Sequence, residues 1–156
     1  MIRTYATPLA FKAAVEQRLR NEIAWTGMEL PRRRQLLPLE AHVAEKLHAY
    51  TLHRPRPNSR VKDMPDLALL ASMRPLEAPE LRAAIDFVFE HRATHPAPTE
   101  LPDPPKAWGP VYARMADVDG LAWKNLGELV EAVRRFLDPV LAGDRGRWDP
   151  AGWTWR

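Results

Sequence analysis

Five charged residues have the types and the spacing that phosphate binding requires. Lys46 is followed fourteen residues later by the segment RVKDMPD, residues 60–66. Cationic side chains attract phosphate oxygens, and the positive end of a helix dipole adds to this attraction when such a cluster lies at a helix N-terminus. The candidate substrate-binding residues are therefore Lys46, Arg60, Lys62, Asp63 and Asp66.

The same residues have a structural alternative, a salt-bridge network between two helices. Helices are predicted over residues 38–54 and from Ser59 or Asp63 to Met73, and two helices joined by a short loop pack as antiparallel neighbours. Because the second helix should start where the first one ends, we expect Lys46 to lie some two turns from the other charges. Spacing alone favours the salt-bridge network over phosphate binding.

Other catalytic and metal-binding patterns are weak or missing. Asp117-Val118-Asp119 has the form of the paired carboxylates that hold magnesium, but it precedes Gly120, so we interpret it as an aspartate-rich turn. The seven glycines form no phosphate-binding loop, and the five histidines form no HExxH zinc motif. No catalytic residue, metal ligand or resident cofactor is assigned from these patterns.

Composition limits the class of protein. The length of 156 residues suits one domain, and the absence of cysteine excludes disulfides and thiolate metal sites. No apolar run reaches the 18 residues of a membrane span, so we expect a soluble, cytoplasmic protein without membrane contact. The net charge of +3 is mild, and we interpret the basic residues between 54 and 62 as a solvated loop rather than as an RNA-binding patch.

The pattern of apolar residues predicts an all-α fold, a compact bundle of about six helices with a proline-rich extended segment. Residues 125–141 have the broadest apolar face and should be central to the core. Residues 94–108 contain five prolines and should be extended, with Trp108 as an anchor, while the three tryptophans of the C-terminal tail should pack back onto the bundle. No segment has the alternation of a strand. The predicted helices begin near Thr7, Pro38, Ser59 or Asp63, Pro79, Gly109 and Asn125.

The segment AEKLHAYTLHRPRPNSRVKDMPDLALL, residues 44–70, closely resembles the C-terminal helical part of AbiEii/AbiGii-type nucleotidyltransferase toxins. YATPLAFKAAVEQRLRNEIAWTG is similar to the N-terminal helix of the same family, and residues 89–108 and 133–143 are similar to the remainder of its C-terminal region. The resemblance covers nearly the whole chain. By this resemblance we expect residues 1–156 to form one helical domain, with an N-terminal helix over 1–30 and a C-terminal helical region over 38–156.

The resemblance implies a toxin of a toxin–antitoxin or phage-defence system that uses a nucleoside triphosphate with Mg²⁺ and modifies tRNA. It also implies roles for individual residues. Family motif positions that contact nucleotide or assist catalysis are matched by Lys46, Arg60, Lys62 and Asp63. Asp66 lies in the same motif, and Pro65 replaces the apolar residue that usually separates the two acids.

The family's catalytic core is missing between the two matching parts. The chain passes from RRRQLL directly to PLEAHVAEKLHAY, and the junction near residues 36–38 resembles an internal deletion. In the family, the core supplies a glycine loop for the triphosphate and an Asp-x-Asp pair for magnesium. Phosphoryl transfer depends on positioning and charge neutralisation by such groups, so we expect the chain alone to be inactive as an enzyme.

Three functions remain open on the sequence. The chain is a nucleotide- or RNA-binding module or a vestigial one, or it is one part of a split nucleotidyltransferase that acts on tRNA with a partner chain. The third alternative is an interaction module that binds a cognate antitoxin, a full-length toxin or a second copy of itself. Apolar surface uncovered by loss of the core would favour this last alternative.

Overall fold

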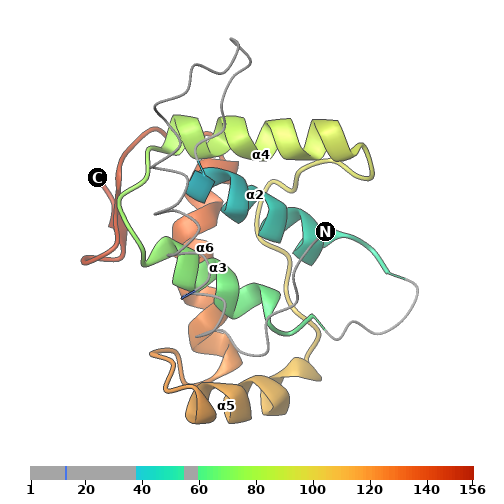
Figure 1. Ribbon diagram of the computed structural model, residues 1–156, viewed down its shortest axis with the longest axis vertical. Helices are drawn as coiled ribbons and strands as arrows, with labels where there is room; N and C mark the ends of the chain where they lie inside the picture. Colours follow the sequence, from blue (N-terminus) through green and yellow to red (C-terminus); the bar gives the residue numbers. More distant parts are fainter. Residues whose placement is uncertain (1–12, 14–37, 55–59) are drawn as a thin grey trace.

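The structure is a computed structural model that describes residues 13, 38–54 and 60–156 (Figure 1). Within these residues it contains five α-helices and one two-stranded antiparallel sheet. The predominantly helical class is confirmed, whereas the helix predicted to begin near Thr7 lies outside the described residues. The elements are α2 (Pro38–Thr51), α3 (Asp63–Ala71), α4 (Ala78–Arg92), α5 (Trp108–Val118), α6 (Leu126–Leu141), β1 (Trp148–Asp149) and β2 (Thr154–Trp155).

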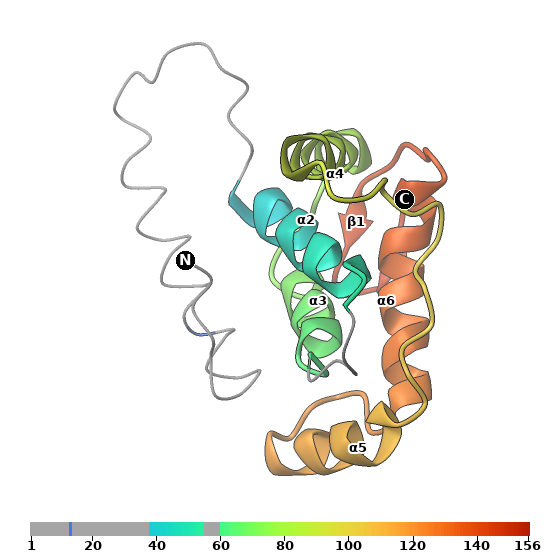
Figure 2. The ribbon, with the colours of Figure 1, turned by 90° about the vertical axis from the view of Figure 1, so that its right-hand side faces the viewer.

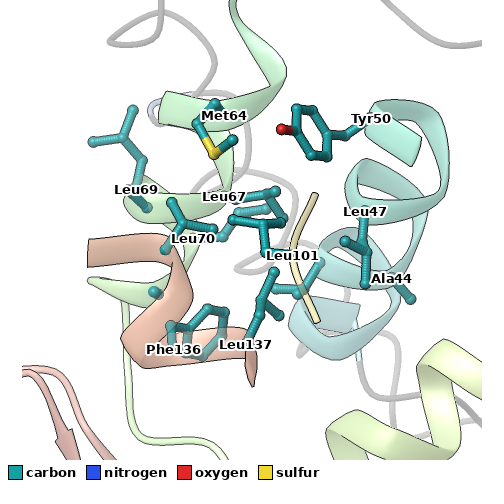
Figure 3. Close-up of a cluster of buried hydrophobic side chains, with 14 of the residues drawn as sticks. Ala44, Leu47, Tyr50, Met64, Leu67, Leu69, Leu70, Leu101, Phe136 and Leu137 are labelled. Atoms are coloured by element: carbon teal, nitrogen blue, oxygen red, sulfur yellow. The ribbon is translucent and has the colours of Figure 1, made fainter. Parts of the chain in front are cut away.

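Helix α6 forms one side of the core, and α2, α3 and α4 form the other (Figure 2). Its apolar residues recur every three or four positions, so they occupy one face, and that face is buried as predicted. Figure 3 shows Leu47 of α2, Leu67 of α3 and Phe136 of α6 directed into a common cluster. Helix α5 lies across one end of α6 (Figures 1 and 2).

Local sequence signals explain where the helices begin. Asn125 caps α6, because its side-chain oxygen accepts a hydrogen bond from the backbone N–H of Glu128 at 2.9 Å. Helix α3 begins at Asp63 rather than at Ser59, so Pro65 occupies the first turn. A backbone N–H there has no partner within the helix, and proline is therefore tolerated. None of the helices in residues 38–54 and 60–156 is long and apolar enough to cross a membrane.

Residues 93–107, here called the strap, connect α4 to α5 without helix or strand and run along α6 (Figure 2). Ala93 ends α4 with a φ of 50°, and the chain turns there. The strap buries Leu101, whose backbone N–H donates to Asp138 Oδ1 at 2.8 Å. The tyrosine hydroxyl of Tyr50 donates to the carbonyl oxygen of Pro102. The strap is thereby attached to α2 and α6 midway along its length.

A short hairpin of β1 and β2 follows α6, although no alternation of apolar and polar residues predicts strands there. The strands pair Trp148 with Trp155, and Trp148 is completely buried. Its indole N–H donates to the carbonyl oxygen of Ala71, at the end of α3, at 2.8 Å. The indoles of Trp153 and Trp155 donate to carbonyl oxygens of α6. The prediction that the three tail tryptophans pack back onto the helices is therefore confirmed.

Candidate functional site

Lys46 lies against the first turn of α3 and contacts both of its acidic residues. Its Nζ atom is 2.7 Å from Asp66 Oδ2 and 3.4 Å from Asp63 Oδ1. Arg60 Nη1 is 3.3 Å from the other oxygen of Asp63, and Lys62 occupies the N-cap position of α3. We refer to these five residues as the Lys46 cluster.

The expectation that Lys46 lies two turns from the other charges is wrong. It assumed a short connection that would place the start of α3 beside the end of α2. Helix α2 ends at Thr51 and α3 begins at Asp63, so the connection comprises residues 52–62. A connection of this length allows α3 to begin beside the middle of α2, where Lys46 lies.

Helical spacing explains why these polar groups border the core. Lys46 follows the buried Val43 by three residues, which places it beside the buried face of α2. Asp63 and Asp66 are also three residues apart and share a face of α3 next to the fully buried Met64. The apolar packing of α2 on α3 therefore determines how close the amine approaches the two carboxylates.

The two carboxylates are buried more deeply than the cations around them. The side chains of Asp63 and Asp66 are 5% and 4% exposed, whereas those of Lys46 and Arg60 are 17% and 30% exposed. Among the described residues, Asp66 Oδ1 has no hydrogen-bond partner. Burial raises the pKa of Asp66 to about 6, because the charge and hydrogen bond of Lys46 offset the loss of hydration only in part.

A comparison with protein families adds to this geometry. The family model described as "Nucleotidyl transferase AbiEii toxin, Type IV TA system" matches residues 8–136, which is well over half of the chain. The chain belongs to the AbiEii toxin family. A search of curated proteins found no match.

Membership in the AbiEii family confirms the resemblance on which the sequence analysis relied. It indicates a protein related to the nucleotidyltransferases of toxin–antitoxin systems. The matched region contains the entire Lys46 cluster and ends within α6, before the tryptophan hairpin. The roles of the individual cluster residues stay predictions.

In this AbiEii-family chain, the charged groups of the Lys46 cluster have two alternative uses, as a structural salt-bridge network and as a phosphate-binding site. The ion pairs are those of the salt-bridge network that spacing favoured. Three cations face two carboxylates, so the fully ionised cluster has a net charge of +1. A phosphate that reached Lys46 would compete with Asp66 for its amine, and anion binding should therefore be weak while Asp66 is ionised.

The described residues do not fit a resident Mg²⁺. Magnesium is held by carboxylates together with phosphate oxygens and water, and the described part of the chain has no group of three or more side chains that could hold a metal. Three of the four carboxylate oxygens of Asp63 and Asp66 already contact Lys46 or Arg60. Asp119 and Gly120, whose φ is 62°, form the turn that follows α5, whereas Asp117 lies in the last turn of the helix. The interpretation of these residues as a turn is therefore confirmed for Asp119 only.

A second polar group, which was not among the candidate residues, also lies at the border of the core. His48 is only 6% exposed. Its Nε2 atom is 2.7 Å from Thr94 Oγ1 of the strap. The available signal was spacing, since His48 follows the buried Ala44 by four residues and therefore shares its face.

Proposed function

We propose that this AbiEii-family chain binds the phosphate groups of a nucleotide, either free or within RNA, and has no catalytic core of its own. In this proposal residues 1–156 form one helical domain, with an N-terminal helix over 1–30 and the family's C-terminal helical region over 38–156. Lys46, Arg60 and Lys62 bind phosphate, and Asp63 and Asp66 position Lys46.

The observation that carries the proposal is the buried carboxylate of Asp66 beside Lys46. An ionised carboxylate with one unpaired buried oxygen destabilises the fold, and a neutral or apolar residue would avoid that cost. Groups with strongly perturbed pKa values cluster at functional sites. Asp66 also lies within the region that the AbiEii family model matches, and its raised pKa supports a role in binding.

The protonation state of Asp66 determines how strongly the cluster binds phosphate. While Asp66 is ionised, it occupies the amine of Lys46 at 2.7 Å. When Asp66 is neutral, that electrostatic attraction is lost, and a phosphate oxygen competes for the amine with the longer contact to Asp63, at 3.4 Å. Because the pKa of Asp66 is raised to about 6, this change falls between pH 7.5 and pH 5.

Asp66→Asn should bind a fluorescent ATP analogue and a labelled tRNA more tightly than the wild type at pH 7.5, by about tenfold, which corresponds to 1.4 kcal/mol. Its affinity for each ligand should match that of the wild type at pH 5. Its affinity for tRNA, whose phosphodiesters do not titrate in this range, should change little between the two pH values. Lys62→Ala should weaken binding and, for tRNA, reduce the salt dependence by about one counterion. Fluorescence anisotropy at several salt concentrations measures both effects.

The matched control is Arg135→Ala, which removes one exposed cation on α6 that pairs with Glu131. It should leave both affinities unchanged. The proposal is overturned if neither ligand binds, or if Asp66→Asn and Arg135→Ala have the same affinities. Binding of ATP alone or tRNA alone identifies the source of the phosphate.

The purified chain, incubated with Mg²⁺, labelled nucleoside triphosphates and tRNA, should incorporate no label above background. The reason is that the sequence encodes neither the triphosphate-binding glycine loop nor the acid pair of the family core. A full-length relative serves as the positive control. Robust incorporation by this chain alone would overturn the absence of a catalytic core.

Membership in a toxin–antitoxin family also supports an antitoxin as a protein partner. A cytoplasmic location and a contribution to phage defence belong to the same proposal, since nucleotides and tRNA are found in the cytoplasm. Purification from the native host distinguishes the alternatives by what co-purifies. An antitoxin supports an interaction module, whereas a chain with the missing core supports a split nucleotidyltransferase.

A further inference from the structure

A chain of side-chain hydrogen bonds attaches the beginning of the strap to α2. His48 Nε2 lies 2.7 Å from Thr94 Oγ1, and Thr94 Oγ1 lies 2.9 Å from His95 Nδ1. His95 Nε2 in turn lies 2.7 Å from Thr51 Oγ1. These four residues, here called the histidine clasp, join two side chains of α2 to two side chains of the strap.

The direction of each hydrogen bond follows from the hydrogens available. The hydroxyl of Thr51 donates to the carbonyl oxygen of Leu47 at 3.0 Å, so its oxygen accepts from His95 Nε2–H. Neutral His95 then has an unprotonated Nδ1, which accepts from the hydroxyl of Thr94. The Thr94 oxygen finally accepts from His48 Nε2–H. The complete chain therefore requires neutral His95.

A second proton on His95 reverses one link of this chain. Protonated Nδ1 becomes a donor, so the hydroxyl of Thr94 loses its acceptor and must turn elsewhere. The imidazole centroids of His48 and His95 are 4.8 Å apart, and two charged rings at this separation repel each other. Phe89 makes T-shaped contacts with both histidine rings, with centroids 5.1 Å apart in each case, and carries no charge.

Charged groups on the neighbouring elements shift the pKa of His48 in opposite directions. Arg92 of α4 opposes a positive charge on His48, and Glu45 of α2 favours one. These two residues pair with each other at 2.8 Å, which reduces the net effect of either. Together, burial, His95 and Arg92 lower the pKa of His48 below its ordinary value.

We propose that the histidine clasp is a proton-operated latch, in which protonation of the His48–His95 pair releases residues 93–97 of the strap from α2. The release is local. Leu101, Asp138 and Tyr50 attach the strap midway along its length through hydrogen bonds that contain no histidine. The latch is separate from phosphate binding, because the clasp shares no residue with the Lys46 cluster.

Nuclear magnetic resonance from pH 7.5 to pH 5 tests the latch in the full chain. The amides of Thr94, His95 and Ala97 should shift with the same midpoint as the imidazole signals of His48. Their hydrogen exchange, corrected for intrinsic rates, should rise by up to about tenfold for each pH unit between the ordinary histidine pKa of 6.5 and the lowered midpoint of His48, and should level off below that midpoint. The amide of Leu101 should remain protected.

His48→Gln keeps a donor near the position of Nε2 and removes the charge that repels a proton on His95, so the acid transition of the strap amides should move by at least one pH unit. His91→Gln is the matched control, because His91 is exposed and stacks on Phe87 at 5.8 Å, outside the clasp. The latch is overturned if the strap amides do not follow the histidine titration in the wild type. It is equally overturned if both variants behave alike. The wild-type comparison decides the question even if His48→Gln unfolds.

Discussion

Lys46→Met should lower the free energy of unfolding by about 3 kcal/mol at pH 7.5. Methionine retains an unbranched stem of similar length, so most of the packing beside Val43 is kept and mainly the charge is removed. Asp63 and Asp66 then remain buried without their shared cation. At pH 5 the loss should be smaller, because Asp66, with a pKa of about 6, is largely protonated in both proteins. Urea unfolding at the two pH values measures the difference.

Asp66→Asn should change stability in the opposite direction to Lys46→Met. In the wild type, burial raises the pKa of Asp66 from 3.8 to about 6, so the folded state binds this proton more tightly than the unfolded state. The contribution of Asp66 to stability is therefore complete below pH 4 and is lost as the pH rises to 6. Asn should recover up to about 3 kcal/mol at pH 7.5 and nothing at pH 4. Combined with Asp66→Asn, Lys46→Met should cost less than it does alone.

Arg135→Met is the control for the loss of an exposed ion pair, and it should change stability by less than about 0.5 kcal/mol. His48 titrates in every variant, so its contribution cancels when each variant is compared with the wild type at the same pH. A cost for Lys46→Met that equals that of Arg135→Met would contradict the burial of the cluster. An equal cost at pH 7.5 and pH 5 would contradict the raised pKa of Asp66.

Trp148→Ala should lower the free energy of unfolding by about 4 kcal/mol, through lost apolar contact and the cavity left behind. Trp148 is completely buried and lies 5.0 Å from the ring of Phe136, measured between centroids. Its indole hydrogen bond to Ala71 also joins the hairpin to α3. Urea unfolding with an unchanged m-value measures the loss in a two-state transition.

Trp148→Phe separates the ring from its hydrogen bond. It keeps much of the aromatic volume and leaves the carbonyl of Ala71 unpaired, so it should cost about half as much as Trp148→Ala. Val118→Ala, at a side chain that is 83% exposed, should have almost no effect. A cost for Trp148→Ala similar to that of Val118→Ala would show that the hairpin does not seal the core.

The helices could be predicted because each contains its own signal. Leu129, Val133 and Phe136 of α6 recur at intervals of four and three residues, and the structure buries all three. The hairpin could not be predicted, because each strand has two residues and so few positions show no alternation. Its strands are held mainly by indole contacts with α3 and α6, which no local pattern reveals.

The candidate site was predictable in its residue types but not in its geometry. Charge and motif selected the five candidate residues, whose roles stay predictions, and the position of Lys46 depended on where α3 packs along α2. Spacing indicates that His48 lies beside the buried face of α2, but no sequence signal pairs it with Thr94, which is 46 residues away in the chain. They meet because Ala93 turns the backbone at the end of α4, in a conformation that the residue type alone does not favour.

The hairpin also determines when the protein can complete its fold. Trp148 bonds to residues far earlier in the chain. Its backbone N–H donates to the carbonyl oxygen of Leu76 and its indole N–H to that of Ala71, both more than 70 residues earlier. During translation the earlier helices must therefore leave the ribosome with this part of their apolar surface still open. Chaperone binding to the nascent chain should thus persist until residues 148–155 emerge and close the core.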